Sequence, residues 1–372
     1  MSLPTVAVVV GTRPEAIKMI PVLRALRSEE GLRTLLVSTG QHREMLDQIL
    51  GPFEARVDHD MRLMEPGQTL YKLSSRAISA FEAMLVEHSP QLVLVQGDTT
   101  TAMLGGLCAF YGKVAVGHVE AGLRTGNKLF PFPEEVNRRL LSVLADLHFA
   151  PTEANRRALM AEGVAEDRIF VTGNTVIDTL RLARGMRAPP PPVAIGGRRL
   201  VLVTAHRRES FGGPLQEIFA ALCDLADAYP DIAIVYPAHL NPHVQRPAKE
   251  MLSGRRNIHL CAPVDYFSFV HLMSMAELIL TDSGGVQEEA PSLGVPVLVM
   301  RNETERMEAV EAGVVRLVGT RRDDIVREAR VLLDSASERH RMSEAINPYG
   351  DGFSGERIAK HVKAWLRAHD QR

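Results

Sequence analysis

The chain has 372 residues, of which 45% are hydrophobic and 24% charged, and its formal net charge is −2. This length exceeds that of one ordinary hydrophobic core, so we expect two domains. The near-neutral charge gives no strong field for nucleic acid or a membrane surface, and no apolar run approaches the eighteen residues of a transmembrane helix. Neither nucleic acid nor a membrane is an expected partner.

The cysteines and the N-terminal sequence indicate in which cellular compartment the protein resides. Cys108, Cys223 and Cys261 lie far apart and form no CxxC pair, which favours a reducing compartment and no zinc site. The sequence enters an apolar strand at Val6–Val10 without the basic and long apolar regions of a signal peptide. We therefore expect a cytoplasmic protein.

Short apolar runs alternate with longer segments of helical period along the chain. Several runs are rich in valine and leucine without alternation, as in parallel strands that are covered on both faces. The expected strands are Thr5–Val10, Arg33–Ser38, Leu92–Gln96, Val114–Val119, Leu147–Ala150, Ile169–Thr172, Leu200–Thr204, Ile232–Tyr236, Ile258–Cys261, Leu278–Thr281 and Val297–Val299. Repeated strand–helix–strand units predict an α/β fold with doubly wound, Rossmann-like sheets.

The strand–helix pattern restarts near Gly173, which predicts an N-terminal domain over 1–172 and a C-terminal domain over 173–352. Residues 354–368 are expected to form an amphipathic helix. The segment from Gly350 to Gly355 matches G-x-G-x-x-G, but it follows Asn-Pro-Tyr rather than a strand, and no second strand follows its helix. We therefore expect no NAD site.

Candidate groups in the first domain follow its strands, because ligands of open parallel sheets bind at the carboxyl ends of the strands. Arg13 and Lys18 follow the first strand and are suited to a diphosphate, although a solvated charge explains Lys18 equally well. Asp98 follows Leu92–Gln96 and is either a helix N-cap or a catalytic group.

Two further acids of the first domain have different local explanations. Glu120 closes a buried strand, where a carboxylate is costly unless it is paired or functional, so function is favoured. Glu134 begins a helix, where favourable placement against the helix dipole is the better local explanation.

The second domain offers a phosphate site. Ser283, Gly284 and Gly285 turn a strand into a helix whose first N–H groups are unpaired, and Glu289 is placed to accept hydrogen bonds from ribose hydroxyls. His206 follows another strand beside two arginines, which suggests an anionic ligand. No motif for a metal, for nucleotide hydrolysis or for a serine nucleophile is present. Together these groups predict a nucleotide-sugar held between two domains.

Seven motifs in order resemble the non-hydrolysing UDP-N-acetylglucosamine 2-epimerases. They are Gly11-Thr-Arg-Pro-Glu-Ala-Ile-Lys18, Gln96-Gly-Asp-Thr-Thr100, Val119-Glu-Ala-Gly-Leu-Arg-Thr-Gly126, Phe132-Pro-Glu-Glu-Val-Asn-Arg138, Thr172-Gly-Asn-Thr-Val-Ile-Asp178, His206-Arg-Arg-Glu209 and Thr281-Asp-Ser-Gly-Gly-Val-Gln-Glu-Glu289. The resemblance implies the two-domain GT-B-like architecture of nucleotide-sugar glycosyltransferases, with residues 353–372 packed back onto the first domain. It also implies a homodimer, no NAD and no metal, and the interconversion of UDP-GlcNAc and UDP-ManNAc for cell-surface polysaccharide synthesis.

The resemblance assigns roles by motif position. The catalytic positions are Asp98, Glu120, Glu134 and His206. The UDP-binding positions are Arg13, Lys18, His206, Phe269, Ser283, Gly284, Gly285, Glu289 and Arg306, with Phe269 placed where the family packs the uracil and contacts it through main chain. A possible allosteric UDP-GlcNAc site would involve Gln41, Arg207 and His239.

The expected mechanism is elimination of UDP to a 2-acetamidoglucal, followed by re-addition. Inversion at C2 requires acid–base groups on both faces of the sugar, so several carboxylates are expected rather than one. The alternatives are a GT-B glycosyltransferase, a hydrolysing epimerase, a silent UDP-sugar-binding module, and a 2-epimerase for a modified UDP-sugar.

Overall fold

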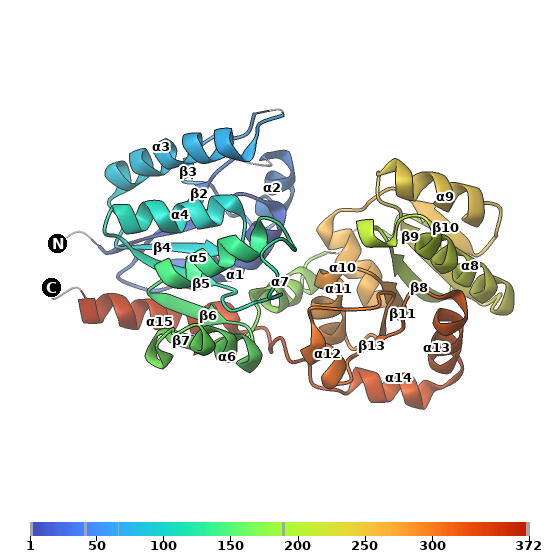
Figure 1. Ribbon diagram of the computed structural model, residues 1–372. Helices are drawn as coiled ribbons and strands as arrows, with labels where there is room; N and C mark the ends of the chain where they lie inside the picture. Colours follow the sequence, from blue (N-terminus) through green and yellow to red (C-terminus); the bar gives the residue numbers. More distant parts are fainter. Residues whose placement is uncertain (1–2, 41–42, 66, 188–189, 370–372) are drawn as a thin grey trace. The chain divides into compact units, whose positions relative to one another are not determined.

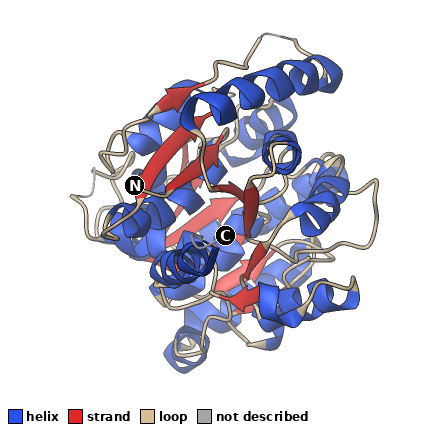
Figure 2. Cartoon of the chain, turned by 90° about the vertical axis from the view of Figure 1, so that its left-hand side faces the viewer, coloured by secondary structure: helices blue, strands red, loops and turns tan. Residues whose placement is uncertain are grey.

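The computed structural model describes residues 3–40, 43–65, 67–187 and 190–369. The chain divides into two compact units, one formed by Met1–Thr179 with Tyr349–Arg372 and the other by Leu180–Pro348 (Figure 1). Each unit is built on one sheet whose strands pair in parallel. Figure 2 shows helices on both sides of the strands. The prediction of two parallel-sheet α/β domains is confirmed.

The first sheet has the order β3-β2-β1-β4-β5-β6-β7 and the second the order β10-β9-β8-β11-β12-β13. The strands are β1 Thr5–Val10, β2 Arg33–Ser38, β3 His59–Asp60, β4 Leu92–Gln96, β5 Ala115–Val119, β6 Leu147–Ala150, β7 Ile169–Val171, β8 Arg199–Thr204, β9 Ile232–Pro237, β10 Ile258–Cys261, β11 Ala276–Thr281, β12 Val297–Val299 and β13 Val315–Leu317. The strand order reverses between β1 and β4 and between β8 and β11, and such switch points are where open sheets bind ligands.

The α-helices alternate with the strands. They are α1 Arg13–Arg27, α2 Arg43–Leu50, α3 Leu70–His88, α4 Thr100–Tyr111, α5 Glu134–Leu144, α6 Glu153–Ala161, α7 Thr175–Arg184, α8 Gly213–Ala228, α9 Pro242–Leu252, α10 Tyr266–Met275, α11 Gly284–Glu289, α12 Met307–Glu311, α13 Arg322–Asp334, α14 Ala336–Ser343 and α15 Ser354–His369. Among the helices described here, none is long and apolar enough to cross a membrane.

The hydrophobic core of each unit lies between its sheet and the covering helices. In the first unit, alternate residues such as Val93 and Val95 of β4 pack against Phe81 of α3 and Leu104 of α4. In the second unit, β8, β9 and β11 pack against α8, α9 and α13. The strands are buried on both faces, which explains why they read as continuous apolar runs.

The borders of the units differ from the predicted borders at 172 and 352. The hydroxyl of Thr179 donates to the carbonyl of Ile17, and the N–H of Asn174 donates to the carbonyl of Tyr349 at 2.7 Å. These bonds place residues 173–179 and 349–352 with the first unit, because they tie the start of α7 to α1 and to the returning chain. The sequence pattern marks where strands stop, not which unit the following residues pack with.

The segment that matches G-x-G-x-x-G begins α15, which packs against α1. A Cβ atom on Gly355 would lie 2.7 Å from the backbone carbonyl of Pro21, and the N–H of Gly355 donates to Asp178 at 2.7 Å. Glycine is needed at this position because the backbones of the two helices approach each other so closely. The motif here serves helix packing.

The strands β3 and β13 were not predicted. β3 consists of two polar residues, and β13 has only three residues. Such short segments carry too little apolar pattern to be recognised, and they pair only because an edge strand is already in place beside them.

Candidate functional site

Two predicted carboxylates follow neighbouring strands of the first unit. Asp98 lies two residues beyond β4, and Glu120 directly follows β5, which pairs with β4 in parallel. Both therefore lie at the carboxyl edge of the sheet. Gly97, at a φ of +70°, brings the loop close to Glu120, because a Cβ atom on Gly97 would lie 3.6 Å from Glu120 Oε2.

Glu120 is held by three side chains. Its carboxylate forms an ion pair with Lys18 and accepts hydrogen bonds from Gln96 and, at 3.2 Å, from Asn174 Nδ2. Its side chain is 12% exposed. Its φ of +65° lies in the left-handed region, which costs a non-glycine residue roughly 1–3 kcal/mol. The surrounding bonds hold this unfavourable conformation and fix where the carboxylate points.

Asp98 is set by an arginine and by the other acids. Arg138 Nη2 lies 2.7 Å from Asp98 Oδ2, and Asn137 Nδ2 donates to the backbone carbonyl of Asp98 at 2.9 Å. Burial raises the pKa of Asp98; the charge of Arg138 opposes this rise, and the charges of Glu120 and Glu134 add to it. A carboxyl whose pKa is raised above its ordinary value is better suited to giving and taking protons near neutral pH than an unperturbed one.

The helix-cap explanation of Asp98 is excluded by geometry. The N-cap of α4 is Thr99, whose hydroxyl accepts from Ala102 N at 3.0 Å. The side chain of Asp98 pairs with Arg138 instead.

Glu134 begins α5, as predicted, and is half-buried. Within the described part of the chain, its Oε2 atom is buried and accepts no hydrogen bond. A buried carboxylate oxygen without a partner is costly, and placement at the start of a helix does not by itself explain it. The charge of Glu134 acts on Asp98, which places Asp98, Glu120 and Glu134 in one electrostatic cluster.

Glu15 was not predicted and organises the loops around this cluster. Its carboxylate is 3% exposed and accepts from Gly11 N at 3.0 Å, Thr12 N at 2.6 Å and Thr99 Oγ1 at 2.7 Å. Burial raises the pKa of Glu15, and these hydrogen bonds oppose the rise. Arg13 stands beside this loop, half-buried, with no side-chain hydrogen bond or ion pair to any described residue.

His118 fixes the loop that carries Asp98. It is fully buried in β5, and its Nε2 lies 2.7 Å from the carbonyl oxygen of Gly97. Burial lowers the pKa of His118 to about 4, so the ring is neutral at pH 7. Because its partner is a carbonyl, the ring proton resides on Nε2 and is donated to Gly97. His118 is therefore a positioning residue.

In the second unit, Asp282 orients His206. Asp282 follows β11, is fully buried, and accepts the N–H groups of His206 at 2.6 Å and Arg207 at 2.7 Å. Its other oxygen lies 3.4 Å from His206 Nδ1. Burial lowers the pKa of His206, although the charge of Asp282 opposes this, and the ring stacks on His239 at 5.6 Å. Neither Asp282 nor this stacking was predicted.

The predicted phosphate site starts α11. Ser283 is its N-cap without a side-chain capping bond, and a Cβ atom on Gly284 would lie 2.5 Å from the guanidinium carbon of Arg306. Glycine at 284 thus allows Arg306 to lie against the helix start. Arg306 Nε donates to Glu288 at 2.7 Å, and Arg306 also pairs with Glu305. The Arg306 guanidinium and the N-terminal end of α11 therefore lie together where an anion is expected.

The residues expected at the nucleoside are held by α10 and α11. Tyr266, at the start of α10, donates its hydroxyl to Glu289 Oε2 at 3.0 Å. The N–H of Phe269 donates to the carbonyl of Asp265 at 3.0 Å, so this main-chain donor is used within the helix. Phe269 is half-buried and offers its ring.

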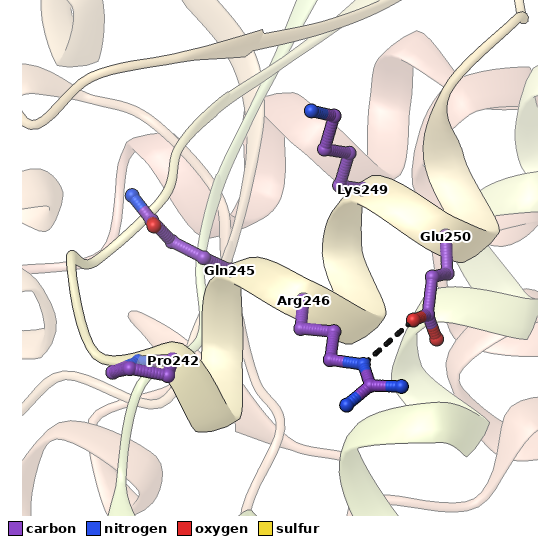
Figure 3. Close-up of a pocket in the computed structure, with 5 residues that line it drawn as sticks. All are labelled: Pro242, Gln245, Arg246, Lys249 and Glu250. Carbon is purple, nitrogen blue, oxygen red and sulfur yellow. Dashed lines mark hydrogen bonds and ion pairs between the residues drawn. The ribbon is translucent and has the colours of Figure 1, made fainter.

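Of the three positions expected at an allosteric site, Gln41 lies outside the described residues. A surface pocket beside α9, lined by Pro242, Gln245, Arg246, Lys249 and Glu250, contains none of the predicted site residues (Figure 3).

Comparison with known proteins is decisive. The sequence profile of the family UDP-N-acetylglucosamine 2-epimerase matches residues 24–363. The chain belongs to this family. A protein of Ralstonia nicotianae named "probable UDP-N-acetylglucosamine 2-epimerase" is 53% identical over 371 residues, covering 97% of this chain and 99% of that protein.

Solved structures of this epimerase family agree. A crystal structure of a UDP-N-acetylglucosamine 2-epimerase from Listeria monocytogenes, named there as putative, has a TM-score of 0.93 at 44% identity and covers 99% of this chain and 98% of its own. The Neisseria meningitidis UDP-GlcNAc 2-epimerase bound to UDP-GlcNAc has a TM-score of 0.88 at 43% identity, covering 97% and 100%. A glycotransferase of kitacinnamycin, at 13% identity and a TM-score of 0.66, shares the fold, as the GT-B-like prediction requires.

The first testable consequence concerns acid stability. Because the pKa of His118 is about 4 in the folded protein and 6.5 ordinarily, the unfolded chain takes up this proton first as the pH falls. The free energy of unfolding should therefore decrease through His118 between pH 6.5 and 4, by up to about 1.4 kcal/mol per pH unit. His118→Gln should flatten this decrease. The free energy of unfolding at each pH is measured by urea unfolding, followed by the fluorescence of the single tryptophan, Trp365.

The matched control is His340→Gln, which removes a histidine whose side chain is 75% exposed and should leave the slope unchanged. Equal slopes for the His118 variant and the unmodified protein would contradict the prediction.

Proposed function

We propose that the protein interconverts UDP-N-acetylglucosamine and UDP-N-acetylmannosamine without releasing free sugar. The observation that carries this proposal is the cluster of Asp98, Glu120 and Glu134, in which the pKa of Asp98 is raised by burial and by both other acids. Epimerisation at C2 removes and restores one proton on opposite faces of the ring, and a set of carboxylates, one of them with a raised pKa, suits that task.

The proposed reaction has two steps, elimination of UDP and its re-addition. A carboxylate takes the C2 proton while the C1–O bond breaks, and UDP leaves with the bonding electrons to give the 2-acetamidoglucal. UDP oxygen then adds back to C1 as a proton is delivered to the other face of C2. We assign proton transfer to the three carboxylates of the first unit, without assigning their faces.

The diphosphate is assigned to the second unit and to Arg13. The helix start at Ser283–Gly285, Arg306 and His206 would stabilise the negative charge that develops on departing UDP, and Glu289 would bind the ribose. The pairing of Lys18 with Glu120 gives that lysine a second task, namely to hold the carboxylate in place.

The reaction as proposed needs neither nicotinamide nor metal, because no hydride moves and the carboxylates carry the proton. We further propose a cytoplasmic location, which the free thiols of Cys108, Cys223 and Cys261 support and cell fractionation would check. A supply of ManNAc for surface polysaccharide is the proposed role.

The direct test is incubation of the dialysed protein with UDP-GlcNAc in D2O, with EDTA present and no added nicotinamide. NMR should show UDP-ManNAc that carries deuterium at C2. Free ManNAc would indicate hydrolysis, and unchanged substrate would reject the proposal in favour of a modified UDP-sugar, a glycosyltransferase that needs an acceptor, or a silent binding module.

Asp98→Asn should lower turnover by about 10²–10⁴-fold, the usual contribution of a positioned acid–base group, while UDP affinity stays within about threefold. Steady-state rates and calorimetric titration with UDP give the two values. A parallel loss of UDP affinity would show that Asp98 holds ligand or fold instead.

We also propose a homodimer, which exposed apolar side chains on the paired helices α4 and α5 support: Phe110, Tyr111, Leu140 and Val143 are 58%, 67%, 46% and 83% exposed. Light scattering after gel filtration should give twice the mass of one chain. The Val143→Asp variant should have a lower mass, closer to that of a single chain. Ile346→Asp, at an 86% exposed position of the second unit, is the control. A monomeric unmodified protein would reject this proposal.

A further inference from the structure

Two histidines and a glutamate lie close together at one edge of the first unit. None of them is among the site residues assigned above. His59 lies in the edge strand β3, and Glu87 and His88 are the last two residues of α3. His88 Nε2 is 3.1 Å from His59 Nδ1. Oxygens of Glu87 lie 3.6 Å from His59 Nδ1 and 3.7 Å from His88 Nε2.

These separations match the edges of a metal coordination shell. With metal–nitrogen bonds of about 2.0–2.1 Å, two ligand atoms lie about 3.3 Å apart in a tetrahedral site and about 2.9 Å apart in an octahedral one. The distance of 3.1 Å between His88 Nε2 and His59 Nδ1 falls between these two values. The carboxylate oxygens need to move by only a few tenths of an ångström, and Glu87 is free to do so because its side chain is 61% exposed.

The position on the helix independently favours a cation. The C-terminal turn of α3 presents carbonyl groups with partial negative charge, and an acidic residue such as Glu87 is unfavourable there. A divalent ion bound by Glu87 and His88 would offset both charges. An N–H···N bond between the imidazoles accounts for their 3.1 Å contact, and Glu87 adds a third potential ligand against both facing nitrogens.

We propose that His59, Glu87 and His88 form a binding site for one divalent transition-metal ion of borderline softness, such as Zn²⁺. Two imidazoles with one carboxylate are the donors that such ions prefer, and solvent would complete the shell. The ion would join the two-residue strand β3 to the end of α3. Its role is structural, so turnover in EDTA is unaffected by it.

The test uses the full chain without an affinity tag, titrated calorimetrically with ZnCl₂. The expected result is one site in the micromolar range or tighter, with a rise in Tm on addition of Zn²⁺. Replacing Zn²⁺ by Co²⁺ should give the visible absorption of a nitrogen–oxygen site. His59→Ala and His88→Ala should each weaken binding by at least about tenfold, the loss expected when a ligand is removed.

Two variants separate this site from other causes. Glu87→Gln changes an exposed side chain, keeps the fold, and should also weaken binding. His340→Ala removes an exposed histidine that lies 3.9 Å from Glu344 and that, among the described residues, belongs to no group of three potential ligands, so this variant should bind Zn²⁺ as the unmodified protein does. Unaltered Zn²⁺ affinity in both His59→Ala and Glu87→Gln, or no binding below about 100 µM, would overturn the proposal.

Discussion

The carboxylate of Glu120 is the constraint around which the first unit is arranged. A charge at the end of a buried strand is stable only with partners, and Lys18, Gln96 and Asn174 reach it from α1, β4 and the loop before α7. Meeting that requirement brings together segments that are far apart in the chain. It also leaves the backbone of Glu120 in the left-handed region, which shows that the position of the carboxylate is maintained at an energetic cost.

In the second unit, too, a buried carboxylate holds neighbouring segments through hydrogen bonds. The buried Asp282 receives the N–H groups of His206 and Arg207, so one carboxylate at a strand end fixes the loop after the neighbouring strand. In the first unit Glu15 does this for the loops after β1 and β4. In each unit, a buried acid at the switch point of the sheet fixes a neighbouring loop through hydrogen bonds to its backbone.

The networks around Arg301 and Arg306 show how charge is kept near the helix start of α11. Burial alone would raise the pKa of Glu305, but the charges of Arg306 and Arg301 lower it to about 2. Glu305 is therefore ionised and holds both guanidinium groups in place. The arrangement fixes the Arg306 guanidinium beside Gly284.

The sequence by itself determined eleven strands, the two parallel sheets and the family, because period and ordered motifs are local properties that survive without any knowledge of contacts; the short strands β3 and β13 carry too little pattern to be recognised this way. It also placed Asp98 and Glu120 at strand ends. It left the N-cap alternative for Asp98 open and favoured a helix-start role for Glu134, since local patterns do not reveal that Thr99 caps α4 or that Glu134 has a buried oxygen without a partner. Only the tertiary structure decided which residues are the partners: Arg138, Asn174, Asp282 and the His59–Glu87–His88 cluster depend on long-range packing, which no spacing in the sequence records.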